Sequence, residues 1–300
     1  MAAFVQVVDF MGFDGADSNA PWQMVPQGLT REVKLIQGND QLEFTVTGGS
    51  GPPPPPTPAP LGSSSSERRH TAVIEGAKAS QDGGAGLAIE RKRLSPTDQI
   101  VVLRGWRVGS YEVQASDPKT GKPAARLLVD VVKQRTVPIA YYRLLFAEKW
   151  DTRVLNEQAN RIIFDQAGIT LKWLGEFDGA EGSTPITLPP GPVNLENAKT
   201  RTELRFFGNN PGAELMVYLT NFGVDDGNGM TLGDQTIIYS RKWKQPSEFP
   251  RMVETLAHEI GHFLSNGKNH DGKKDDLMFE TSPHGRRIRK DRTMMFVRGL

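Results

Sequence analysis

Three of the five histidines in this 300-residue chain, His258, His262 and His270, fall within one short stretch. The first two stand four residues apart, and Glu259 lies between them. On a helix, residues four apart lie about one turn above each other on the same face, so two imidazoles can reach one metal ion. Glu259 lies about 100° further round, beside such an ion, where a carboxylate can take a proton from water. The spacing therefore predicts a metal site with an adjacent general base.

The chain contains no cysteine, so any metal must be held by histidines and carboxylates. Disulfide frameworks, thiolate zinc fingers and iron–sulfur sites are excluded for the same reason. A catalytic zinc usually has three protein ligands and one open position. We therefore expect His270 as the third ligand, with Gly267 in a left-handed conformation that turns the chain back below the helix. The other candidates for this position are the carboxylates of Asp271, Asp275, Asp276 and Glu280.

The first two histidines need a helix, and the apolar pattern predicts one from 249 to 264, with Pro250 in its first turn. Residues 136–300 as a whole alternate between strand and helix patterns. A second helix is expected to begin after the N-cap residue Asp151 and to end at Gly168. The strands expected here are residues 137–146, 169–174, 214–220 and 236–240, and residues 176–200 are expected to form loops. This part is therefore predicted to be a mixed α/β domain.

Residues 28–135 show the period of two that is typical of strands with one buried face. A proline-rich loop at 48–66, with five consecutive prolines, interrupts this pattern. Seven short strands favour an all-β sandwich, with residues 1–27 as a separate N-terminal segment. The predicted strands are residues 31–37, 41–47, 71–75, 87–91, 99–104, 110–115 and 125–132. The stretch 109–115, followed by a turn and an apolar final strand, resembles the end of a bacterial immunoglobulin-like domain.

The histidine motif as a whole resembles that of the metzincin clan of zinc endopeptidases. Those proteins carry His-Glu-x-x-His-x-x-Gly-x-x-His, followed by a methionine turn. This chain has the same residues from His258 to His270, except that four residues instead of two stand between His262 and Gly267. Half a turn of helix or a wider loop can absorb the two extra residues. An aspartate after the third histidine, here Asp271, is most similar to the adamalysin branch of the clan.

The resemblance also implies roles for residues outside the histidine motif. Met278 would form the methionine turn beneath the zinc ligands, and Glu280, where some relatives have tyrosine, is not expected to bind zinc. Pro283 would line the pocket for the substrate residue after the cleaved bond. A substrate peptide would pair with an exposed antiparallel edge of the sheet. The residues expected at this edge are Met230, Thr231 and Leu232.

The overall charge does not favour nucleic acid or an anionic membrane as a partner, because 36 Lys and Arg residues balance 35 Asp and Glu residues. No stretch reaches the roughly 20 apolar residues of a membrane span, and the N-terminus lacks the basic start of a secretory signal. The basic run 286–292 is expected to be a solvated helix face. His70 and His284 are expected at the surface and not among the metal ligands.

These observations predict a zinc-dependent endopeptidase with a C-terminal α/β metzincin-like domain at residues 136–300 and an N-terminal immunoglobulin-like sandwich. Glu259 would act as general base on a protein or peptide substrate, with one catalytic Zn²⁺. The chain is expected to be secreted or delivered as a toxin or effector without a recognisable signal peptide, its N-terminal domain docking to a secretion apparatus; a cytoplasmic location stays open. The alternative is a non-catalytic binding or structural module with a structural zinc, although such a site needs no general base.

Overall fold

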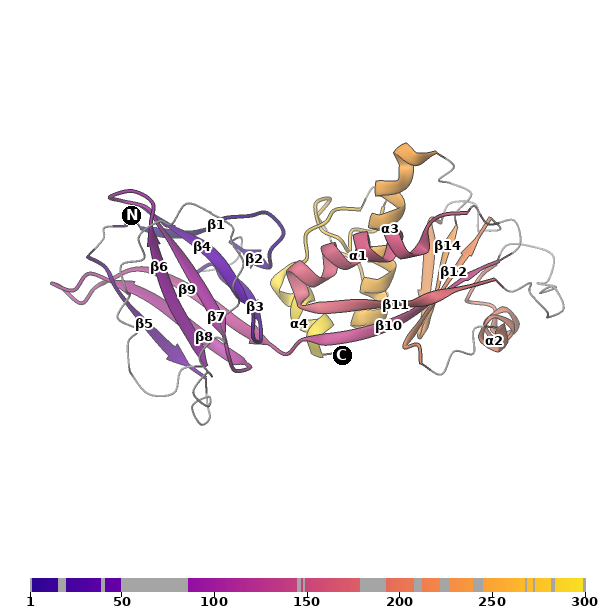
Figure 1. Ribbon diagram of the computed structural model, residues 1–300, viewed down its shortest axis with the longest axis horizontal. Coiled ribbons are helices and arrows are strands. Elements are labelled where there is room, and N and C mark those ends of the chain that lie inside the picture. Colours follow the sequence, from indigo (N-terminus) through magenta and orange to yellow (C-terminus); the bar gives the residue numbers. More distant parts are fainter. Residues whose placement is uncertain are drawn as a thin grey trace, which may run out of the picture. The chain divides into compact units, whose positions relative to one another are not determined.

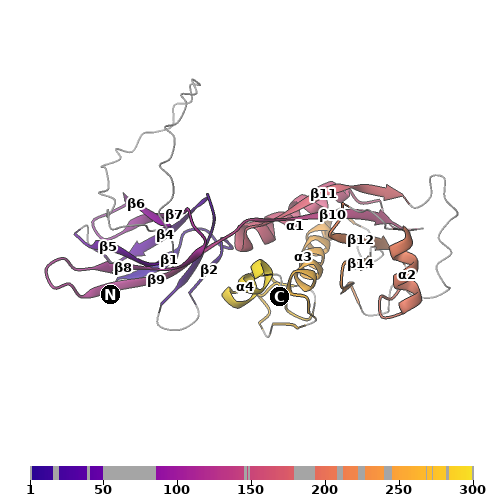
Figure 2. The same ribbon diagram turned by 90° about the horizontal axis from the view of Figure 1, so that it is seen from below.

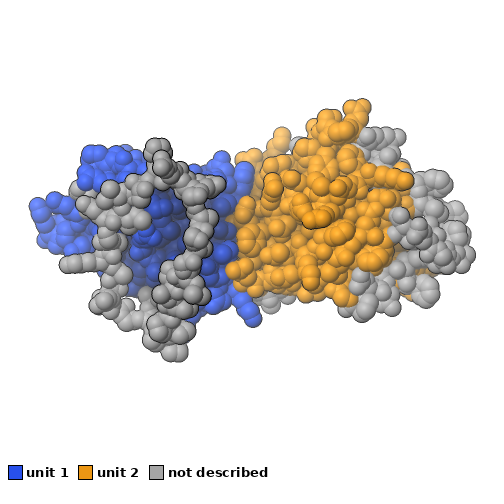
Figure 3. All heavy atoms as spheres, viewed as in Figure 1, with its two compact units in different colours: residues 1–133 blue, residues 134–300 orange. Residues whose placement is uncertain are grey.

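The structure is a computed structural model in which the chain forms two compact units, residues 1–133 and 134–300 (Figure 3). Each unit has a hydrophobic core of its own. The residues that the structure describes are 2–15, 20–38, 41–49, 86–144, 147, 149–178, 193–207, 212–221, 227–239, 245–267, 269–271, 273–281 and 284–298. The proline-rich loop from residue 50 on, the expected strand at 71–75, His70 and Pro283 lie outside this part.

Residues 1–133 form two β-sheets (Figure 1). The first sheet has the order β1-β4-β7-β6, and all neighbours in it are antiparallel. The second has the order β2-β3-β9-β8-β5, in which β3 and β9 are parallel. The strands are β1 (Ala3–Gln6), β2 (Phe13–Asp14), β3 (Trp22–Pro26), β4 (Thr30–Ile36), β5 (Glu43–Gly48), β6 (Leu87–Arg93), β7 (Gln99–Gly105), β8 (Gly109–Ser116) and β9 (Pro123–Val132).

The two sheets share one core, to which each contributes alternate side chains such as Val33 and Leu103 from the first and Val113 and Leu127 from the second. Residues 1–27, which we expected as a separate segment, supply β1, β2 and β3 to these sheets. The pattern missed β3 because all five of its residues are buried, so it shows no alternation. An immunoglobulin-like relationship stays a prediction.

Residues 134–300 are built on a five-stranded sheet with the order β11-β10-β12-β14-β13. Four of its strands are parallel, and β13 is antiparallel to β14 at the edge. The antiparallel edge that the sequence led us to expect around residue 230 is therefore present as β13. The strands are β10 (Arg135–Arg143), β11 (Ile169–Asp178), β12 (Leu215–Thr220), β13 (Gly229–Leu232) and β14 (Gln235–Tyr239).

Helices cover both faces of this sheet. α1 (Thr152–Ala167) and α3 (Phe249–Ser265) pack on one face in the larger core, and α2 (Ala198–Phe207) packs on the other face through Leu204. α4 (Lys290–Arg298) joins the larger core through Phe296 and lies at the opposite end of this unit from α2 in both ribbon views (Figure 1, Figure 2). Among the described residues, no helix is long and apolar enough to span a membrane.

The ends of α1 follow from its capping residues. The Asp151 carboxylate accepts a hydrogen bond from the Val154 N–H at 3.0 Å, and Gly168 takes the left-handed conformation with φ 68°. Both caps were predicted from the sequence. α2 was not expected, although Asn197 before it accepts hydrogen bonds from the Lys199 and Thr200 N–H groups, which is a recognisable cap.

The C-terminal end of α3 differs from the prediction in one residue. The helix continues to Ser265, and Asn266, with φ 47°, takes the left-handed conformation that we expected for Gly267. The physical reason is length: three more helical residues follow His262, so the position that turns the chain falls on Asn266, a residue that tolerates this conformation. Three helical residues therefore separate His262 from the residue that turns the chain.

Candidate metal centre

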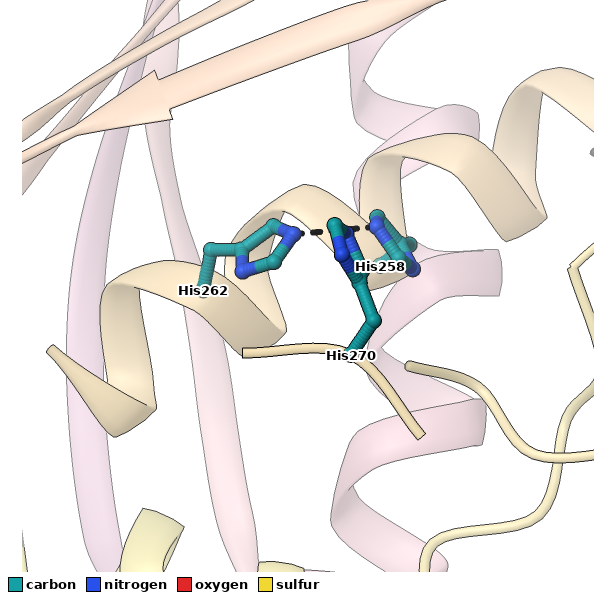
Figure 4. Close-up of side chains that lie close together, drawn as sticks. All are labelled: His258, His262 and His270. Carbon is teal, nitrogen blue, oxygen red and sulfur yellow. Dashed lines mark hydrogen bonds between the residues drawn. The ribbon is translucent and has the colours of Figure 1, made fainter. Parts of the chain in front are cut away.

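His258 and His262 project from one face of α3, and His270 approaches them from the chain that follows the helix (Figure 4). One side-chain nitrogen from each of the three lies within 4.8 Å of those from the others. The two helix histidines are buried, being 3% and 9% exposed, whereas His270 is exposed. The three predicted ligands are thus brought together, two on a rigid helix and one on a loop.

Hydrogen bonds decide which ring nitrogen of each helix histidine is available. His258 Nδ1 lies 2.7 Å from the Leu277 carbonyl oxygen, and His262 Nδ1 lies 2.8 Å from the Gly267 carbonyl oxygen. A carbonyl only accepts, so each Nδ1 carries the proton and each neutral ring keeps its lone pair on Nε2. Backbone carbonyls that hold the Nδ1–H in this way are typical of histidines that bind metal through Nε2.

The two Nε2 atoms, 3.0 Å apart, fit a shared cation. Two facing lone pairs at this distance repel each other, and a positive ion between them removes the repulsion. Two nitrogen ligands of a tetrahedral zinc lie roughly 3.3 Å apart, given Zn–N bonds of about 2.0–2.1 Å. Three imidazoles without a thiolate are also a ligand set that zinc accepts with an open position. The residues present therefore fit zinc.

Burial keeps both helix histidines neutral. It lowers the pKa of His258 to about 2 and the pKa of His262 to about 4, and the neighbouring histidines add to the shift. Because a metal ligand must be unprotonated, neither ring has to release a proton before it binds a cation near neutral pH.

Glu259 lies beside the histidines with its carboxylate turned toward β13. Burial raises the pKa of Glu259 to about 7, although a hydrogen bond from the Thr231 hydroxyl, 2.8 Å from Oε2, opposes the shift. Gly229 gives the side chain room, because a Cβ atom there would lie 2.8 Å from both Cγ and Oε1 of Glu259. Glu259 is not part of the ligand group found among the described residues. Its carboxylate is therefore free to hold a proton.

One residue of the predicted substrate edge, Thr231, contacts Glu259. Thr231 is buried, and its hydroxyl lies 2.8 Å from Thr236 Oγ1 as well as from the Glu259 carboxylate. Met230 and Leu232 pack partly against the core on the other face of the sheet. Of these three side chains, that of Thr231 is buried, whereas those of Met230 and Leu232 are half-buried. The substrate role of these three residues stays a prediction.

Met278 lies beneath the helix at the level of the two histidines. It is buried, and a methyl group added at Gly261 would overlap its sulfur atom. It therefore packs against α3, and its role as a methionine turn stays a prediction. The carboxylates considered as alternative third ligands, at 271, 275, 276 and 280, belong to no ligand group among the described residues.

His284 was expected at the surface, and this expectation is wrong. It is buried, with its ring stacked on His258 at a centroid distance of 3.9 Å and an interplanar angle of 18°. Its Nδ1 lies 2.8 Å from the Phe279 carbonyl oxygen, so the carbonyls of Leu277 and Phe279 orient two stacked imidazoles. Burial lowers the pKa of His284 as well. No local sequence pattern predicts the burial of His284, because its contact with His258 joins residues that are far apart in the sequence.

A cavity of about 470 Å³ opens over the histidines. Its lining consists of residues 227–231, the three candidate ligands, Glu259, Glu280, Thr281 and His284. The cavity is large enough for part of a peptide beside an ion at the histidines. The arrangement can therefore combine metal binding with a general base in a space open to substrate.

Comparisons with known proteins add little to this geometry. No protein-family model matches the sequence, and no curated protein matches it. Among solved structures, part of the chain is similar to archaemetzincin from Methanopyrus kandleri, with 15% sequence identity and a TM-score of 0.41; the match covers 55% of this chain and 95% of that chain. The geometry of the histidines, and not this overlap, carries the function proposed below.

Proposed function

We propose that this protein is a zinc-dependent endopeptidase that uses His258, His262 and His270 as zinc ligands and Glu259 as general base. One observation carries the proposal: three imidazole nitrogens converge on one point, and a buried carboxylate outside the ligand group stands beside them at an open cavity. A purely structural zinc site normally fills all four positions with protein ligands and needs no such carboxylate.

In the proposed hydrolysis, the zinc ligands, Glu259, Thr231 and β13 have separate roles. A bound zinc ion would lower the pKa of a water ligand to near 7 and polarise the peptide carbonyl. Glu259 takes the proton from the attacking water and passes it to the departing amine. Thr231 holds the carboxylate of Glu259 in place while it does so. Among the described residues, β13 forms the edge of the sheet, with which an extended peptide can pair.

Zinc analysis combined with a cleavage assay tests this proposal. Purified protein should contain about one zinc per chain and should cleave an unfolded protein such as reduced casein. A chelator should abolish cleavage, and added zinc should restore it. One tightly bound zinc without cleavage of any unfolded protein or peptide library would instead support the non-catalytic module with a structural zinc.

We further propose that residues 1–133 are an immunoglobulin-like docking module and that the protein acts as an effector outside the producing cell. The two sheets around one core support the module. Comparing export of the full chain with export of residues 134–300 from the producing cell tests this. Equal export, or none of either, would contradict it.

A further inference from the structure

The C-terminal basic run 286–292, expected as a solvated helix face, is instead engaged with acidic residues of the same unit. Arg286 pairs with Glu254 of α3 at 2.9 Å, and Arg289 pairs with Asp276 at 2.6 Å. Arg292 pairs with Asp271 at 2.9 Å. The last two acidic residues lie between the third histidine and Met278, so α4 and the turn before it hold the loop that carries a metal ligand.

Arg292 has the most direct connection to that ligand. Its Nε donates to Asp271 Oδ1 at 2.9 Å, and its Nη2 donates to the Asn269 carbonyl oxygen at 3.1 Å. Asn269 and Asp271 are the two neighbours of His270 in the chain. One buried guanidinium therefore binds the backbone of the residue before the third histidine and the side chain of the residue after it.

The orientation of the His270 ring depends on its backbone more than the orientations of the other two histidine rings do. His258 and His262 stand on a helix, and carbonyl oxygens orient their rings. The ring of His270 receives no hydrogen bond from the part of the chain that the structure describes, and it is exposed. The direction from which its nitrogen reaches the metal is therefore set by residues 269–271, which Arg292 holds.

Arg292 stands on α4, which is held in place by contacts with α3 and α1. Phe296, on the same helix, packs closely against Gly261 of α3, and the Thr293 hydroxyl donates to the Gln166 carbonyl oxygen at 3.3 Å. Asp271 is held from a second side, because its N–H donates to the Met278 carbonyl oxygen at 2.7 Å. Arg292 and Asp271 thus form a clamp that joins α4, the His270 loop and the segment 277–279, whose carbonyls orient the rings of His258 and His284.

We infer that Arg292 is a positioning residue for the metal site, acting through His270 to set the affinity for zinc; this rests on the proposed zinc ligation. Arginine suits the task because its planar fork can donate to a carboxylate and a carbonyl at once, whereas lysine offers a point charge. Partners behind metal ligands commonly change metal affinity by about 10–100-fold when they are removed.

Zinc affinity of the full-length protein, measured by competition with a chromophoric chelator, tests the inference without any substrate. Arg292→Met should weaken zinc binding about 10–100-fold and reduce the visible absorption of the Co²⁺-substituted protein. Arg286→Met is the matched control, since it breaks an ion pair of the same run outside the loop, and it should leave zinc affinity unchanged. Arg292→Lys, which keeps the charge and is less disruptive to folding, should give a smaller loss.

A double-mutant comparison shows whether Arg292 acts through the third histidine. In a His270→Ala background, Arg292→Met should cause little further loss of zinc affinity. The inference is overturned if folded Arg292→Met and Arg292→Lys bind zinc like the wild type, if the loss is equally large in the His270→Ala background, or if the wild type binds no zinc. A wild type that binds zinc but cleaves nothing contradicts the peptidase proposal alone.

Discussion

At the scale of single residues, the candidate metal site depends on backbone carbonyls that each bind the Nδ1–H of a histidine ring and so leave Nε2 as its available ligand atom. The carbonyls of Leu277 and Gly267 each accept the Nδ1–H of a helix histidine, so both Nε2 lone pairs face the same point. Beside them, Glu259 is kept from the ligand group and is held by the Thr231 hydroxyl. A base that does not bind the ion can exchange a proton with water, which is what hydrolysis requires.

Replacing the base should separate metal binding from catalysis. Glu259→Gln keeps the shape of the side chain but cannot take up a proton, so we expect a fall in kcat of about 10²–10⁴-fold. Zinc content should stay at the wild-type level because Glu259 is not among the ligands. Peptide hydrolysis and elemental analysis of the same sample measure both quantities. Wild-type activity in this variant would rule out Glu259 as the base.

Removing the hydroxyl of Thr231 should lower the rate of hydrolysis and leave zinc binding unchanged. Thr231→Val preserves the shape and removes the donor to Glu259, which we expect to lower kcat about tenfold, because hydrogen bonds to charged groups contribute about 1.5–3 kcal/mol. Thr231→Ser retains the hydroxyl and is the control. Equal activity losses in the two variants would show that packing, and not the hydrogen bond, is responsible.

The metal-free protein should lose stability as the pH falls from 7 to 5. The pKa values of His258 and His262 are lowered to about 2 and 4 from 6.5, so in this range the unfolded chain binds protons that the folded chain does not. The free energy of unfolding then decreases on acidification. The raised pKa values of Glu259, about 7 instead of 4.5, and of Asp276 act in the opposite sense, but the lowered pKa of His284 adds a third histidine to the first two. Urea unfolding with a chelator present measures this.

The same unfolding experiment has an internal control. Glu259→Gln removes one opposing carboxylate, so its stability should fall more steeply between pH 7 and 5 than that of the wild type. A free energy of unfolding that is constant or rises over this range in the metal-free wild type would contradict the assigned histidine shifts.

At the scale of elements, the C-terminal half of α3 packs closely against Met278 and Phe296. Gly261, between the two histidines, leaves room for the sulfur of Met278 and the ring of Phe296. The helix then ends at Asn266, which turns the chain toward His270. The position of the helix relative to the loop therefore depends on one small residue and one left-handed residue.

Two glycine substitutions test this description of α3. Gly261→Ala forces Met278 and Phe296 to move, so we expect a loss of about 1–3 kcal/mol in the free energy of unfolding. Gly267→Ala should cost less than about 0.5 kcal/mol, because a Cβ there meets only the Ser265 carbonyl oxygen at 3.6 Å. Thermal unfolding of the two variants compares them. A larger loss at Gly267 would restore it as the turning residue in place of Asn266.

At the scale of the whole molecule, all residues of the proposed site lie in one of the two compact units. The core of residues 1–133 and the cores of residues 134–300 share no residues, and every group of the proposed site belongs to the second unit. A ligand that binds only one unit stabilises that unit by mass action and leaves an independent unit unchanged.

Separate expression of the two units should show this division. Residues 134–300 should unfold cooperatively, with a midpoint that rises by several degrees when zinc is added in excess of its Kd. Residues 1–133 should unfold with a midpoint that zinc does not change. Calorimetry of both fragments and of the full chain measures the midpoints. A zinc-dependent midpoint in residues 1–133 would contradict the confinement of the site to the second unit.

The sequence by itself determined what depends on neighbours in the chain. The four-residue spacing of His258 and His262, the caps of α1 and the alternation in β7 and β8 are local signals, and a helix or strand follows directly from them. The convergence of His270 on the other two also agrees with the expectation from its short separation. The predicted end of α3 was one residue too early, because helix propensity does not decide where a helix stops.

Only the tertiary structure decided the surroundings of these residues. The carbonyl of Leu277 that sets the tautomer, the stacking of His284 on His258, the hydroxyl of Thr231 and the clamp of Arg292 join segments 19 to 28 residues apart. Such contacts depend on how the chain returns after each turn, and this is fixed by packing of the whole unit and not by spacing in the sequence. The sequence therefore identified the candidate ligands, and the fold decided how their rings are held.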